Sequence, residues 1–76
     1  MSITELNDSL SNLVYNRATI KRNQGLRGVI FKEVRDLTHK IDNRSREPQW
    51  KQLIDLIDLE IINIELKIEQ IQNKNE

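Results

Sequence analysis

The segment that follows Pro48 constrains this chain most, because it is apolar on two opposite sides. It contains no glycine and no further proline, and an apolar pattern sustained over about 25 residues is typical of a helix rather than a strand. On a helical wheel, with about 100° per residue, most of its large apolar side chains share one broad face. These are Trp50, Leu53, Ile54, Ile57, Ile61, Ile64, Ile68 and Ile71.

A second apolar face lies on the opposite side of this predicted helix and consists of Leu56, Leu59, Ile62 and Leu66. Polar side chains separate the two faces, with Asp58, Glu65 and Glu69 on one flank and Glu60, Asn63 and Lys67 on the other. In a chain this short, the remaining residues can cover one of these two apolar faces, and the other is left exposed. Because a row of exposed aliphatic side chains marks a protein contact, we expect the second face to form an oligomer interface.

Part of the same segment, residues 62–69, alternates strictly between apolar and polar residues, as a half-buried strand does. No other part of the chain alternates in this way, so such a strand would have no partner. We therefore predict a helix from about residue 48 to residue 72, followed by a frayed tail at 73–76.

The N-terminal half predicts a helix that begins with a capping box. In Ser2-Ile3-Thr4-Glu5 the serine hydroxyl can accept a hydrogen bond from the backbone N–H three residues later, while Glu5 reaches back. The apolar residues of this segment are spaced mainly three and four apart and form one stripe. They are Ile3, Leu6, Leu10, Leu13 and Val14.

Two glycines, Gly25 and Gly28, leave the continuation of this helix open. Each costs about 1 kcal/mol in a helix interior relative to alanine, and the apolar stripe moves to a different side of the wheel from Leu26 onward. Either the helix breaks near Gly25 into two helices, or one continuous or kinked helix touches different neighbours along its length. We favour a helix over about 2–43, because no proline or polar cluster accompanies the glycines.

A connector at about 43–47 joins the two predicted helices, since Pro48 suits the first turn of a helix. The expected fold is a single all-α domain spanning residues 1–76, arranged as a long antiparallel helical hairpin. The charges agree: residues 1–46 hold nine Lys and Arg against five Asp and Glu, whereas residues 47–76 hold three against seven. Halves of opposite charge favour antiparallel packing.

The small size of the chain favours self-association. A core within 76 residues rarely contributes more than about 3–5 kcal/mol without a disulfide, a structural metal or oligomerisation. The chain has no cysteine and one histidine, which leaves oligomerisation. We therefore expect a homodimer in which two hairpins form a four-helix bundle. The alternatives are a three-helix monomer, with the N-terminal segment folded back over the second face, and a complex with a different protein.

Basic residues form a second candidate site. In a continuous first helix, Arg17, Lys21, Lys32 and Arg35 lie on one side, and Arg27 flanks them. Such a stripe is able to contact phosphates or an acidic partner. The same pattern also fits a face that is solvated or paired with the acidic second helix, and no aromatic side chain interleaves it for base stacking.

Catalytic machinery is not indicated. His39 has acids three residues before and after it, which is the spacing of surface charge pairs, and no nucleophile or oxyanion site accompanies it. We expect no catalytic residue, no cofactor and no metal. The N-terminus lacks the pattern of a signal peptide and no apolar run reaches membrane-spanning length, so we expect a cytoplasmic protein without membrane contact.

These features predict a small non-enzymatic protein-interaction module, a homodimeric helical adaptor or a regulator or inhibitor of another protein. The alternative function is a small nucleic-acid-binding protein that uses the basic stripe of the first helix. The zero net charge of the chain weakens this alternative.

Overall fold

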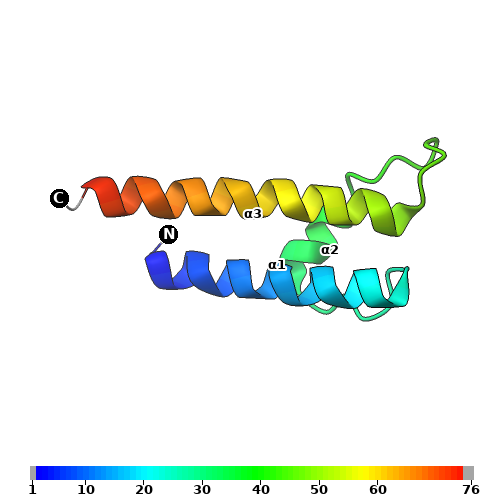
Figure 1. Ribbon diagram of the computed structural model, residues 1–76, viewed down its shortest axis with the longest axis horizontal. Helices are drawn as coiled ribbons and strands as arrows, with labels where there is room; N and C mark the ends of the chain where they lie inside the picture. Colours follow the sequence, from blue (N-terminus) through cyan, green and yellow to red (C-terminus); the bar gives the residue numbers. More distant parts are fainter. Residues whose placement is uncertain (1, 75–76) are drawn as a thin grey trace.

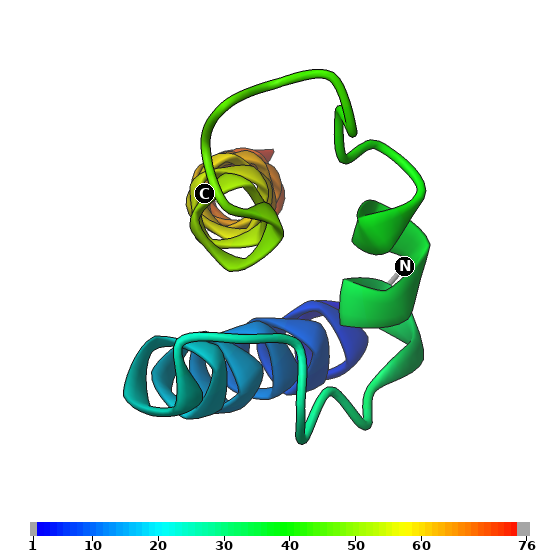
Figure 2. The same cartoon turned by 90° about the vertical axis from the view of Figure 1, so that its right-hand side faces the viewer.

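The structure, a computed structural model, describes residues 2–74 and contains three helices in that range: α1 (Ile3–Asn23), α2 (Lys32–Thr38) and α3 (Gln49–Lys74). α1 and α3 lie side by side and antiparallel (Figure 1). The short α2 packs against both, so the three helices form a triangle when viewed along α1 and α3 (Figure 2). The all-α prediction is confirmed, but the simple two-helix hairpin is wrong because a third helix follows α1.

α1 begins directly after Ser2, where the serine half of the predicted capping box is present. The Ser2 Oγ accepts a hydrogen bond from the backbone N–H of Glu5 at 3.2 Å. The helix ends at Asn23 because Gln24 adopts a left-handed conformation (φ 50°), with its backbone N–H donating to the carbonyl of Ile20. A residue in this conformation terminates a helix. The continuous helix that we favoured over about 2–43 is therefore wrong, and the break expected as the alternative is present.

Residues 24–31 form a loop that lies against α1. Gly28 has φ +89° in this loop, a conformation that residues with a side chain rarely adopt. Leu26 and Val29 pack from the loop against the core, and α2 adds two buried side chains, Val34 and Leu37. The shift of the apolar stripe from Leu26 onward therefore marks the loop and α2, a separate helix that packs against both α1 and α3.

A connector of residues 39–48 joins α2 to α3 and is longer than the predicted one. The Gln52 side chain holds it in place: Oε1 accepts from the Asp42 N–H at 2.9 Å, and Nε2 donates to the carbonyls of Asp42 (3.1 Å) and Glu47 (3.0 Å). α3 continues through Lys74, and residues 75 and 76 of the predicted tail lie outside the described residues.

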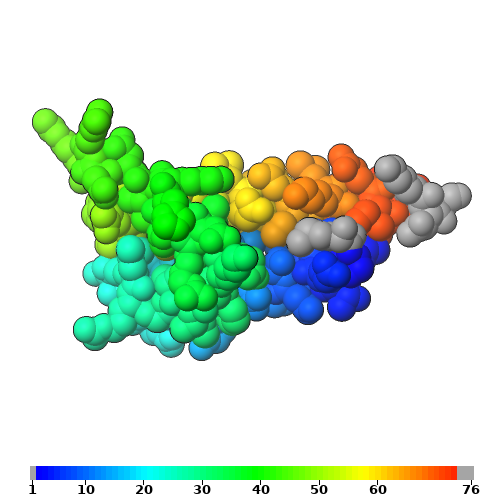
Figure 3. All heavy atoms as spheres, turned by 180° about the vertical axis from the view of Figure 1, so that it is seen from behind, coloured from blue at the N-terminus to red at the C-terminus, as the bar shows by residue number. Residues whose placement is uncertain are grey.

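The core lies between α1 and α3 and is closed on one side by α2. Its buried apolar members come from all three helices: Leu6, Leu13, Ile20, Val34, Leu37, Leu53, Ile57 and Ile64. The main apolar face predicted for the last helix turns toward this core, and those of its members that are not fully buried pack against it. Seen from behind, residues 24–48 cover one half of the α1/α3 pair, whereas the other half shows α1 and α3 directly (Figure 3).

Candidate interaction surface

Three aliphatic side chains on α3 point away from the core. Leu59, Ile62 and Leu66 retain 61%, 54% and 51% of their accessible surface, and we call these three residues the outer stripe. Their spacing of three and four residues places them on one side of α3, opposite the members of α3 that enter the core. The outer stripe is therefore a row of apolar side chains that the described part of the chain leaves more than half exposed.

Leu56, the fourth predicted member of the second face, has a different environment. It is half-buried and packs against the core. A core of three helices surrounds more of α3 than a two-helix hairpin would, so one edge of the second face is covered. The exposed apolar surface of α3 is therefore narrower than the sequence indicated.

Carboxylates border the outer stripe at both ends and along one side. Asp55 lies one turn before Leu59, and Glu69 lies about one turn after Leu66. The acidic border consists of Asp55, Asp58, Glu65 and Glu69. The other side of the stripe is bordered by uncharged amides, Asn63 and Gln70. The stripe is thus apolar in the middle, with carboxylates on three sides and amides on the fourth, and Arg17, Lys21 and Lys51 lie beside Asp55 and Asp58 near its N-terminal end.

One acid of this border is paired within the chain. The Arg17 Nε donates to the Asp58 Oδ1 at 2.7 Å, which links α1 to α3. The two side chains are 35% and 45% exposed, so solvent screens the pair and its contribution to stability is small. Asp55, Glu65 and Glu69 are exposed, and among the described residues the Arg17–Asp58 contact is the ion pair that forms.

The basic residues of the second candidate site do not lie on one helix. Lys21 lies in the last turn of α1, Arg27 lies in the loop, and Lys32 and Arg35 lie on α2. All four are exposed, but α1 ends at Asn23 and therefore cannot align them. With Arg17 bound to an acid of α3, the continuous basic stripe expected from the sequence is not formed.

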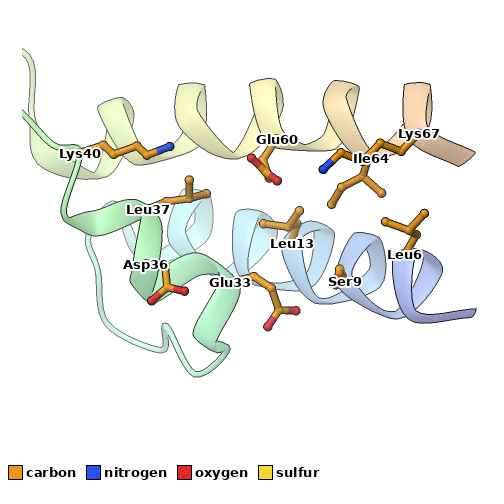
Figure 4. A pocket seen from close by; sticks show the side chains of 10 residues that line it. All are labelled: Leu6, Ser9, Leu13, Glu33, Asp36, Leu37, Lys40, Glu60, Ile64 and Lys67. Carbon is orange, nitrogen blue, oxygen red and sulfur yellow. The ribbon is translucent and has the colours of Figure 1, made fainter. Parts of the chain in front are cut away.

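A cavity of about 300 Å³ opens between the three helices on the side of α2 (Figure 4). Its apolar floor consists of Leu6, Leu13, Leu37 and Ile64. Its rim carries acids from α2 and α3 together with Lys40 and Lys67, whose side chains extend toward Glu60 (Figure 4). The rim thus carries charges of both signs, and its charge does not point to a particular class of ligand.

A smaller apolar patch lies on α1 and the loop. Val14, Tyr15 and Ile30 are 51%, 58% and 58% exposed. The Tyr15 ring meets the Phe31 ring edge to face, with centroids 5.9 Å apart, so this patch is partly engaged within the chain. It is comparable to the outer stripe in exposure, and the residues that line a shallow hollow with Val14 and Tyr15, Leu10 and Ser11, are uncharged.

Asn16 is an important residue that the sequence analysis did not single out. Its side chain is fully buried; Nδ2 donates to the Gly28 carbonyl at 3.2 Å, and Oδ1 accepts from the N–H groups of Ile30 (3.3 Å) and Phe31 (3.2 Å). The amide thus fixes the loop to α1. The available signal was its position within the apolar stripe, three residues after a leucine and four before an isoleucine.

Within residues 2–74, no group of three or more His, Cys, Asp and Glu side chains is placed to hold a metal ion. None of the helices in this range is long and apolar enough to cross a membrane. Comparison with models of known protein families, with curated proteins and with solved structures finds no match to this chain.

Proposed function

We propose that this chain is a small non-enzymatic protein-interaction module that forms a homodimer through the outer stripe and serves as an adaptor or regulator of another protein. The observation that carries the proposal is the exposure of Leu59, Ile62 and Leu66, each more than half accessible. Apolar side chains in a row on one helix gain free energy when another surface covers them. A second copy of the chain is the simplest such surface.

The size of the outer stripe limits the strength of this dimer. A stable interface buries about 800 Å² on each partner, which is more than three half-exposed side chains provide. We therefore expect a weak dimer, with a dissociation constant on the order of 100 μM. A dimer of this strength exchanges its subunits readily, which suits a module that also binds another protein.

Sedimentation equilibrium over a range of about 10 μM to 1 mM tests the proposal. The wild-type chain should shift from monomer to dimer across this range, and the variant Leu59→Asp/Ile62→Asp should stay monomeric because it places charges in the interface. Far-UV circular dichroism checks that the variant keeps its helices. Leu59 and Ile62 are exposed, so their replacement leaves the core intact.

The matched control is Val14→Asp/Tyr15→Asp, which replaces two apolar side chains of similar exposure on α1. This variant should dimerise like the wild type, because it leaves the outer stripe unchanged. A wild-type chain that is monomeric throughout the range contradicts the proposal. So does a stripe variant that dimerises as well as the control.

A further inference from the structure

We infer that the outer stripe binds a basic amphipathic helix of another protein in preference to a second copy of this chain. The inference rests on the proposed function, because it concerns the same surface, and it names the chemistry of the partner. The acidic border carries it. The apolar residues alone would bind any helix with an apolar face. The charges around them determine which of these helices binds more tightly.

The geometry of α3 places carboxylates in line with the outer stripe. The series Asp55, Leu59, Ile62, Leu66 and Glu69 has spacings of four, three, four and three residues, which is the repeat of a helix-pairing seam. A partner helix that covers the three apolar side chains therefore also covers the two acids at its ends. Both are exposed and form no ion pair within the described residues.

Pairing of α3 with α3 of a second copy brings these acids together in either orientation. In an antiparallel pair centred on Ile62, Asp55 faces Glu69 of the second copy. In a parallel pair, each of the two acids faces its own counterpart. The antiparallel pair also brings the acidic flanks together, with Glu65 near Asp58 of the second copy. Like charges that face each other oppose pairing, so self-association is possible but weakened.

A helix with Lys and Arg beside its apolar residues turns each of these repulsions into an attraction. Asp55, Glu65 and Glu69 then meet cations, while Asn63 and Gln70 accept any polar neighbour on the far side. Cations also lie at the N-terminal end of the acidic side, because Arg17, Lys21 and Lys51 line a hollow together with Asp55 and Asp58. The Lys51 Nζ lies 5.6 Å from the centroid of the Trp50 ring. The border is therefore most negative toward its other end, where Glu65 and Glu69 are exposed and attract the cations of a basic helix.

Two synthetic helical peptides of about 20 residues test this preference. Both carry leucines at the seam positions; one has lysines and the other has glutamates at the flanking positions. Titration calorimetry with the intact chain should show binding of the lysine peptide and at least about tenfold weaker binding of the glutamate peptide. Salt should weaken the lysine complex, because the charges are exposed. Equal binding of both peptides, or of neither, overturns the inference.

The variant Asp55→Asn/Glu69→Gln gives a sharper test, because it should change two affinities in opposite directions. It should bind the lysine peptide several-fold more weakly and dimerise several-fold more tightly, since the same two charges attract the peptide and repel the second copy. The control variant Asp36→Asn/Glu60→Gln changes the net charge equally but at the rim of the cavity on the side of α2. It should leave both affinities near the wild-type values.

The outcomes separate this inference from the proposed function. If the chain dimerises through the outer stripe but binds neither peptide, the proposed dimer is supported and the basic partner is contradicted. If the chain binds the lysine peptide but does not dimerise, the basic partner is supported and the proposed dimer is contradicted. If the control weakens peptide binding as much as Asp55→Asn/Glu69→Gln does, net charge rather than the acidic border drives binding, and the inference fails.

Discussion

Gly28 shows how strongly one position can determine the path of this chain. It has φ +89°, and a Cβ atom built on it would lie 2.6 Å from the Thr19 Cγ2 of α1. Both facts require glycine: the first because side chains disfavour this conformation, and the second because two carbon atoms cannot approach so closely. Because of this close contact the loop lies against α1, and α2, which follows the loop, packs against the core.

We therefore expect Gly28→Ala to destabilise the fold by about 1–3 kcal/mol. Gly25→Ala is the matched control, because its Cβ would make only an ordinary contact, 3.9 Å from the Asn23 carbonyl oxygen. Urea unfolding followed by circular dichroism should give a change within about 1 kcal/mol for this control. Equal effects of the two substitutions would show that the loop does not depend on the conformation of Gly28.

The connection between α1 and the loop depends on hydrogen bonds from one buried amide. Asn16→Ala leaves the N–H groups of Ile30 and Phe31 and the Gly28 carbonyl without their partner. Because unsatisfied buried polar groups cost about 1–3 kcal/mol each, we expect a loss of roughly 2–4 kcal/mol in the free energy of unfolding. Urea titration measures this loss.

Asn12→Ala serves as the control for this prediction. Asn12 lies on the same helix, and its Nδ2 donates to the Glu33 Oε2 of α2 at 2.7 Å. Asn12 is only half-buried, whereas Asn16 is fully buried, so water can replace the Asn12 amide and the loss should stay at about 1 kcal/mol. An Asn16 variant that is no less stable than the Asn12 variant would mean that other contacts hold the loop, namely its apolar packing and the hydrogen bond from the Asn23 Nδ2 to the Arg27 carbonyl at 2.9 Å.

At the scale of elements, the sequence predicted most reliably what depends on local pattern. The serine cap at Ser2 and the core-facing side of α3 both follow from residues a few positions apart, and both agree with the structure. The break after Asn23 was recognised as an alternative but not preferred. The apolar stripe changes side near Leu26, but the choice between a break and a kink depends on contacts of Gly28 with Asn16 and Thr19, which hydropathy periodicity does not show.

The same distinction explains what the sequence predicted of the candidate surface. Leu59, Ile62 and Leu66 were placed on the outer side of α3 by spacing alone, and the structure exposes all three. Leu56 was assigned to the same face, but in the structure it is half-buried and packs against the core. The basic stripe depended on a straight helix through Gly25, so the break that displaced α2 also separated its members.

At the scale of the whole molecule, stability and self-association should be linked. Among the described residues the core contains eight buried apolar side chains, and a core in a chain this small contributes only about 3–5 kcal/mol of net stability. Any contact made only by the folded chain adds to this stability in proportion to the concentration of its partner. A dimer formed through the outer stripe is such a contact.

We therefore expect the Tm of the wild-type chain to rise by a few °C for each tenfold increase in concentration above about 100 μM. The variant Leu59→Asp/Ile62→Asp should unfold at a Tm independent of concentration, because its folded form does not bind a second copy. Differential scanning calorimetry at several concentrations measures both. A wild-type Tm that stays constant while sedimentation shows a dimer would mean that association continues after unfolding, and that the interface does not require the folded outer stripe.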